Sequence, residues 1–264
     1  MSTLETSSRQ HAALFTLTKN GSLGPDGINT VQWTAKDDRV WFGELSRAIG
    51  TVVMGRETFD TLGRLPLRHR LNYILTRDPD RIPTTATSRP ITLAMWQELA
   101  LRQFCVIGGS EIYQLLWPEI DVLYISQHKV ATPEGKPHQL DMSQTVLFDR
   151  RTDSPTIDKS IYLKPPYLHP KLAIRFDDSD ADKHWMGDLP GLLFVRERKL
   201  LFGSTLDALG ADFLANVDIA CSTLYLTGAW WVDQEASQAL VDAGVSNVVL
   251  NRRWIRQFLQ IVSL

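Results

Sequence analysis

A pair of carboxylates among aromatic side chains is the first group of residues able to do chemistry. Trp33 stands five residues before Asp38, and Phe42 stands four residues after it. Residues four apart share one face of a helix, so Asp38 and Phe42 would lie side by side. A poorly solvated carboxylate between aromatic rings is suited to sharing a proton with a substrate. The alternative is that Asp37 and Asp38 are both exposed acids that complement a helix dipole.

These residues belong to the stretch 31–48, whose pattern predicts an amphipathic helix. Apolar side chains recur at Val40, Trp41 and Leu45, with polar residues between them. Thr34, followed three residues later by Asp37, resembles a capping start. The helix would place both acids in its first turn, and which of them faces the aromatic side chains stays open.

A second group surrounds a glycine-arginine corner at Gly55 and Arg56. Apolar runs at 51–54 and 71–75 predict neighbouring strands of an α/β sheet. Gly55 would let a ligand approach the backbone, and the guanidinium of Arg56 suits a phosphate. Thr58 would cap a short helix or donate a hydrogen bond to a ligand. The alternative is an ordinary turn that carries a surface arginine.

A third group follows the apolar run 104–107. Gly108 and Gly109 end the run, and Ser110 is in position to cap a helix that continues to Leu116. A strand, a glycine pair and a helix start are typical of a pyrophosphate site, although glycine pairs also serve only as turns.

Four motifs occur in a fixed order along residues 12–150: VVMGRETFDTLGRLP, RLNYILTR, VIGGSEIY and LYIS. The ordered set resembles the dihydrofolate reductase family, including its relatives, the reductase domains of riboflavin synthesis. The resemblance implies a dihydrofolate-reductase-like mixed sheet flanked by helices.

The resemblance also implies a substrate site. Asp38 would be the acid that binds the N3 and 2-amino edge of the pterin and promotes protonation of N5, with Trp33 as its catalytic companion. Arg70 would hold the α-carboxylate of the glutamate tail, and Arg68 is the alternative. The implied substrate-binding residues are Phe42, Thr58, Arg70 and Ser126.

The same resemblance implies NADPH as the cofactor. Gly24 would lie in a mobile loop over the nicotinamide, and the Gly108–Gly109 pair would carry a cis peptide next to the cofactor. Arg56, with Thr76 and Arg77, would surround the 2'-phosphate. The implied cofactor-binding residues are Gly24, Gly55, Arg56, Thr76, Arg77, Gly108, Gly109, Ser110 and Tyr113.

The chain departs from the family after the fourth motif. Either the domain ends near Arg150, or an insertion separates its last two strands and LLFVRERK at 192–199 supplies the final one. We place the boundary between 150 and 165, which gives a reductase-like domain at 10–155. Alternating strand and helix patterns from Leu206 onward predict that 156–264 holds an α/β unit of unknown type with parallel strands, including a helix over 204–217.

Composition narrows the function classes. The chain has 264 residues, 44% of them hydrophobic, and a formal charge of −2, which gives no reason to expect nucleic-acid or membrane binding. The N-terminus lacks the order of a signal peptide, so we expect a cytoplasmic protein. Cys105 and Cys221 both lie in apolar runs and are expected as buried thiols, and no spacing of ligands indicates a metal site.

The leading hypothesis is therefore an NADPH-dependent oxidoreductase acting on CH–NH groups, which reduces 7,8-dihydrofolate to tetrahydrofolate. One alternative is a riboflavin-pathway pyrimidine reductase. Another is a non-catalytic scaffold with a reductase fold. A homo-oligomer formed through the C-terminal region is also expected.

Overall fold

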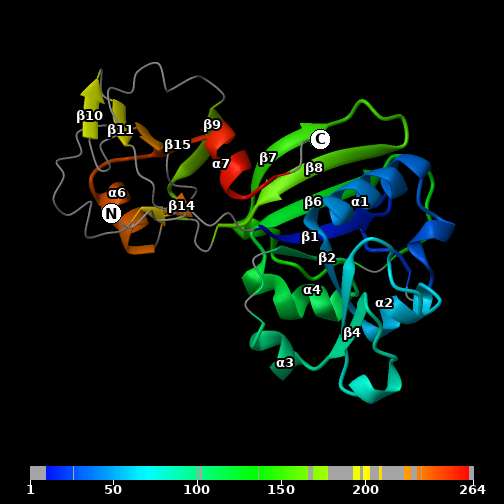
Figure 1. Ribbon diagram of the computed structural model, residues 1–264. Coiled ribbons are helices and arrows are strands. Elements are labelled where there is room, and N and C mark those ends of the chain that lie inside the picture. The colour runs from blue at the N-terminus through cyan, green and yellow to red at the C-terminus, as the bar shows by residue number, and fades with distance from the viewer. Residues whose placement is uncertain are drawn as a thin grey trace. The chain divides into compact units, whose positions relative to one another are not determined.

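The chain divides into two compact units in a computed structural model (Figure 1). The larger unit takes in most of residues 10–164 and the smaller unit most of residues 165–261. The structure describes residues 10–25, 27–99, 101, 103–135, 137–165, 169–177, 193–196, 199–202, 208–209, 223–226, 231–232 and 234–261.

The larger unit is built on an eight-stranded sheet with the order β4-β3-β2-β5-β1-β6-β8-β7. The pairings of β1 with β5 and β6 and of β2 with β3 and β5 are parallel, and so is that of β3 with β4, whereas β8 runs antiparallel to β6. The sheet is therefore mixed, as predicted. Its strands are β1 (Gln10–Leu17), β2 (Thr51–Gly55), β3 (Leu71–Leu75), β4 (Ser88–Ile91), β5 (Gln103–Val106), β6 (Val122–His128), β7 (Val146–Arg151) and β8 (Ile157–Leu163).

Helices pack on both faces of this sheet. Adjacent residues of a strand point to opposite faces, and β6 shows both sides. Leu123 belongs to an apolar core with Trp96 of α3 and Leu116 of α4, whereas Tyr124 makes an edge contact with Trp41 of α1. The helices of this unit are α1 (Lys36–Ile49), α2 (Arg56–Thr61), α3 (Leu93–Gln97) and α4 (Ser110–Leu116), and short 3₁₀ helices are η1 (Thr30–Gln32), η2 (Pro79–Arg81), η3 (Trp117–Glu119) and η4 (Met142–Gln144).

The predicted helix caps are wrong at Thr34, Ser110 and Thr58. Helix α2 begins at Arg56 with Gly55 as its N-cap, so Thr58 lies inside this helix and does not cap it. Helix α1 begins at Lys36 with Ala35 as its N-cap, so Thr34 does not cap it. Helix α4 begins at Ser110 itself, and the backbone of Gly109 takes the cap position without a side-chain hydrogen bond. Extended backbone at all three N-caps fixes where each helix starts, and this conformation is not encoded by the capping side chain alone.

The end of the first sheet decides between the two topologies left open by the sequence. Strands β7 and β8 follow each other directly and complete the eight-stranded sheet. Leu193–Arg196 forms β10, which pairs with β11 in a different sheet. The alternative in which an insertion separates the last two strands of the reductase sheet is therefore wrong. The sheet reaches Leu163, inside the 150–165 interval, and the limits 10–155 and 156–264 stay a proposal about where an independently folding domain ends.

The smaller unit contains a five-stranded sheet with the order β10-β11-β13-β15-β9. All its pairs are parallel except β10 with β11, which agrees with the predicted α/β character. The predicted helix over 204–217 is wrong at Ala208–Leu209, which form a strand, and its remaining residues lie outside the described ones. The elements are β9 (Ala173–Asp177), β10 (Leu193–Arg196), β11 (Lys199–Phe202), β12 (Ala208–Leu209), β13 (Thr223–Leu226), β14 (Trp231–Val232), α6 (Gln234–Asp242), β15 (Asn247–Asn251) and α7 (Arg252–Phe258).

Two further sequence expectations concern burial. Cys105 is fully buried, and burial raises the pKa of its thiol; Cys221 lies outside the described residues. Within the part of the chain that the structure describes, every helix is too short or too polar to cross a membrane.

Candidate active site

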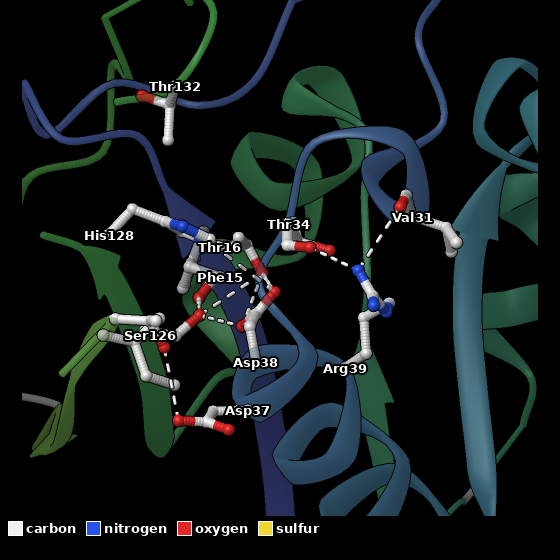
Figure 2. Close-up of polar contacts among 12 residues, drawn as sticks. Phe15, Thr16, Val31, Thr34, Asp37, Asp38, Arg39, Ser126, His128 and Thr132 are labelled. Atoms are coloured by element: carbon white, nitrogen blue, oxygen red, sulfur yellow. Dashed lines mark hydrogen bonds and ion pairs between the residues drawn. The ribbon is translucent and has the colours of Figure 1, made fainter. Parts of the chain in front are cut away.

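Asp38 is the centre of a buried polar cluster at the start of α1 (Figure 2). Its exposed fraction is only 4%. Ser126 donates a hydrogen bond to its Oδ1, and the Thr16 hydroxyl lies 3.3 Å from both carboxylate oxygens as a donor. Burying a carboxylate is unfavourable unless donors replace water, and these two hydroxyls provide that replacement.

The sheet brings the two hydroxyls together. Thr16 of β1 and Ser126 of β6 are direct partners in the parallel register. Both lie close to the carboxyl ends of their strands, the edge at which α/β sheets bind ligands. Thr16 was not among the predicted site residues. Its position near the end of the first predicted strand was the only sequence signal for it.

His128 is a second residue that the sequence reasoning missed. Its side chain is fully buried, and its Nε2 lies 4.0 Å from Oδ2 of Asp38. The Trp33 ring packs against the imidazole, with 5.3 Å between centroids. Trp33 in turn packs on Gly24, because a Cβ at Gly24 would lie 2.4 Å from the indole Cζ2. Since alternate strand residues share a face, the pattern Ser126-x-His128 was a usable signal.

Asp37 has different surroundings from Asp38. Its carboxylate accepts hydrogen bonds from Ser154 at 2.7 Å and from Thr156 at 3.2 Å. The hydrogen bond from Ser154 is the main reason why the pKa of Asp37 is lowered. Of the two acids that the sequence left open, Asp38 is therefore the one enclosed with Ser126.

Arg70 reaches back to helix α1. Its Nη1 donates to the hydroxyl of Ser46, and its Nε donates to the carbonyl of Arg68 at 3.1 Å. Burial is the main cause that lowers the pKa of Arg70, with the charge of Arg47 as a second cause. Arg68, the alternative, is exposed, and Phe42 is half-buried on α1. The structure thus anchors Arg70 more firmly than Arg68, while the role of either stays a prediction.

A glycine corner joins the ends of β2 and β5. The Gly55 amide donates to the Gly108 carbonyl at 2.9 Å, and the Gly108–Gly109 peptide is cis, as the resemblance implied. A Cβ at Gly55 would lie 2.9 Å from Cγ1 of Ile112, and one at Gly108 would lie 3.2 Å from the Thr58 hydroxyl. Both positions therefore need glycine.

Tyr113 and Ser110 flank this corner differently. The Tyr113 hydroxyl donates to the Leu14 carbonyl, and its ring packs on Phe15 with 4.2 Å between centroids. Burial raises the pKa of the Tyr113 phenol, which keeps it neutral. Ser110 is exposed at the start of α4.

The predicted phosphate-binding residues lie at the ends of β2 and β3. Gly55 and Leu75 are register partners, so Arg56 and Thr76 follow at the same edge of the sheet. Arg56 is bound to Asp60 at 2.6 Å, and Arg64 binds the same carboxylate at 2.8 Å. Thr76 is half-buried and Arg77 exposed. We call Arg56, Asp60 and Arg64 the arginine–acid cluster.

A mixed, largely parallel sheet flanked by helices, with a buried acid and a glycine corner at one edge, places the larger unit in the α/β class. The sequence profile of the family described as "Dihydrofolate reductase" matches residues 12–144. Dihydrofolate reductase type 3 of Salmonella typhimurium is 32% identical over 151 residues, which cover 55% of this chain and 88% of that protein. The chain belongs to the dihydrofolate reductase family.

Other relatives match over a shorter part. Dihydrofolate reductases of Bacillus subtilis and Haemophilus influenzae are each 30% identical, over 43% and 42% of this chain. The chain spans 66% of the length of each of these two proteins, just under two thirds. Among solved structures, dihydrofolate reductase from Enterococcus faecalis complexed with NADP(H) and RAB-propyl is 24% identical, with a TM-score of 0.49 and a coverage of 59% of this chain and 96% of that one.

Proposed function

We propose that this protein uses NADPH to reduce 7,8-dihydrofolate to tetrahydrofolate. The observation that carries the proposal is the buried carboxylate of Asp38, held by the hydroxyls of Thr16 and Ser126 at the ligand-binding edge of a sheet of this family. A carboxylate so placed can accept two parallel N–H bonds from a planar heterocycle. The N3 and 2-amino edge of a pterin offers such a pair.

The protein's own groups would bind, orient and protonate the substrate. Asp38 would fix the pterin edge and favour the arrival of a proton at N5, while Trp33 would shield that side from water. Arg70, anchored on Ser46, would hold the carboxylate of the glutamate tail. NADPH, when bound, supplies the hydride that C6 receives.

The residues at the glycine corner fit a dinucleotide. Gly55 and Gly108 let the ends of β2 and β5 pack closely against Ile112 and Thr58, which fixes the glycine corner beside the start of α4. Arg56, Thr76 and Arg77 at the neighbouring strand ends suit a 2'-phosphate. To bind the 2'-phosphate, Arg56 must give up its ion pair with Asp60. This ion pair is exposed enough to permit the exchange.

Turnover of NADPH with dihydrofolate, followed by absorbance, tests the proposal. We expect turnover in the wild type and a loss on the order of 10²- to 10⁴-fold in Asp38→Asn. Asp37→Asn is the matched control, since it removes the adjacent acid outside the cluster, and we expect nearly full activity. NADPH binding without turnover of dihydrofolate would overturn the proposal and favour the pyrimidine reductase or the scaffold.

We also propose that copies of the chain associate through residues 156–264. This association predicts a dimeric or larger mass in solution for the full chain. Light scattering measures this mass, and a monomer at all concentrations would contradict the proposal.

A further inference from the structure

His128 is a buried group whose polar atoms are left without a hydrogen bond. Its side chain has an exposed fraction of 0%, and neither Nδ1 nor Nε2 has a hydrogen-bond partner among the described residues. Leaving such atoms unsatisfied in the interior of a protein is unfavourable. The imidazole therefore has hydrogen-bonding capacity that its packing among the described residues does not use.

The groups around the imidazole leave Asp38 as its nearest charged neighbour. The paired strand β8 presents Ile157, which is apolar and fully buried, as the register partner of His128. The next acid on that strand, Asp158, is bound by Lys129 at 2.8 Å and by Arg150 at 3.1 Å. Only Asp38, with Oδ2 at 4.0 Å from Nε2, faces His128 within ion-pair distance among the described residues.

The two oxygens of Asp38 are held unequally. Among the described residues, Oδ1 accepts from both Ser126 and Thr16, whereas Oδ2 accepts only from Thr16, at 3.3 Å. His128 lies on the side of Oδ2. An N–H at Nε2 would therefore lie beside the less restrained oxygen, 4.0 Å away, and favour one orientation of the carboxylate.

We propose that His128 is a positioning residue for Asp38 and orients the Oδ2 oxygen toward the substrate. Because Trp33 packs between His128 and Gly24, His128 also couples the position of Asp38 to that of the Gly24 loop. The contacts form one chain: Gly24 packs on Trp33, Trp33 packs on His128, and His128 faces Asp38. Any shift of the loop at Gly24 moves the indole and then the imidazole. This inference rests on the proposed function for its consequence in catalysis, but the coupling of the two side chains does not depend on it.

Two variants separate positioning from packing. His128→Gln keeps an N–H donor where Nε2 stands, whereas His128→Leu keeps the volume and removes the donor. We expect His128→Leu to lower kcat for dihydrofolate by about tenfold or more, with a smaller change in KM, and His128→Gln to recover most of the loss. His69→Asn, an exposed loop position at φ 61 that asparagine tolerates, is the control. Equal rates in the Leu and Gln variants would overturn the proposal.

A second measurement works without turnover. The imidazole C–H resonances of His128 are recorded in the wild type, in Asp38→Asn and in Asp37→Asn. We expect a clear shift with Asp38→Asn and none with Asp37→Asn. An unchanged His128 signal in Asp38→Asn would overturn the coupling. If the wild type does not reduce dihydrofolate, the proposed function fails, while these resonances still decide whether the two side chains act together.

Discussion

The acid end and the phosphate end of the candidate site solve the same electrostatic problem in opposite ways. At the acid end, Asp38 is 4% exposed and is held by neutral hydroxyls. At the phosphate end, the Arg56 side chain is 48% exposed and is held by the opposite charge of Asp60. Buried hydrogen bonds fix a geometry strongly, whereas exposed ion pairs are weak and exchange readily. The acid end is therefore preorganised, and the phosphate end is free to exchange partners.

The largest expected effect comes from removing a hydroxyl at the acid end. Ser126→Ala leaves a buried carboxylate short of a donor, which should lower the free energy of unfolding by about 1.5–3 kcal/mol and reduce turnover of dihydrofolate. Ser154→Ala is the control, because Ser154 bonds to the less buried Asp37. Chemical denaturation measures the free energy of unfolding of both variants. Equal losses would show that the deeper burial of Asp38 does not make its hydrogen bond more important for stability than that of Asp37.

Crowding the loop next to the acid end should have an effect nearly as large. Gly24→Ala places a Cβ 2.4 Å from the Trp33 ring, so the indole must move, at a cost of about 1–3 kcal/mol in stability. Gly43→Ala in α1 is the matched control, since its Cβ meets only the flexible end of Arg47 and alanine favours a helix. We expect the midpoint temperature of thermal unfolding to fall for Gly24→Ala and not for Gly43→Ala. A stable Gly24→Ala protein with unchanged tryptophan fluorescence would contradict the described contact.

At the phosphate end the expected change is smaller and has the opposite sign. Asp60→Asn releases Arg56 and Arg64 from their shared carboxylate, so NADPH should bind about two- to fivefold more tightly, as expected for a surface ion pair of up to about 1 kcal/mol. The gain should shrink as salt is added. Titration of NADPH fluorescence measures it, and Glu57→Gln is the control because Glu57 lies 3.8 Å from Arg56 and is 90% exposed. Weaker binding in Asp60→Asn would mean that Asp60 orients Arg56 for the cofactor.

The smallest effect concerns Asp37 and pH. The hydrogen bond from Ser154 lowers the pKa of Asp37 in the folded protein. The contribution of Asp37 to stability is therefore present above the unfolded value of about 3.9 and is lost as the pH falls through the folded value. Asp37→Asn should therefore lower stability slightly at pH 7, where the contribution is present, and flatten the loss of stability below about pH 4, so that the two proteins differ least at the lowest pH. Unfolding curves from pH 3 to pH 7 would show this, and parallel curves for both proteins would exclude it.

Sequence patterns predicted well those features that depend on neighbouring residues. Apolar runs located the strands before and after the Gly55 corner, and the family resemblance implied the cis peptide that the structure contains at Gly108–Gly109. The helix pattern also put Asp38 in the first turn of α1. These features are local, so the residue types carry the information.

Features that depend on register or on backbone conformation were missed. Thr16 and His128 join Asp38 only because β1 and β6 pair in one particular register. The caps predicted at Thr34, Thr58 and Ser110 were wrong because extended backbone at the residue before each helix sets its start. The choice between a short and an interrupted reductase sheet depended on which sheet β10 joins, and apolar content alone does not specify a pairing partner.

The position of β9 in the smaller sheet governs the order in which that unit can form during synthesis. Strand β9 lies at the edge of the sheet, and Ala173 pairs with Asn247 near the end of the chain. A ribosome delivers the first of these residues long before the second, so β9 waits without this neighbour until β15 has emerged. Pairings between distant residues form slowly because a long loop must close first. Nascent chains that stop before β15 would therefore expose an unpaired strand edge, which makes the synthesis of β15 decisive for whether this unit is completed or aggregates.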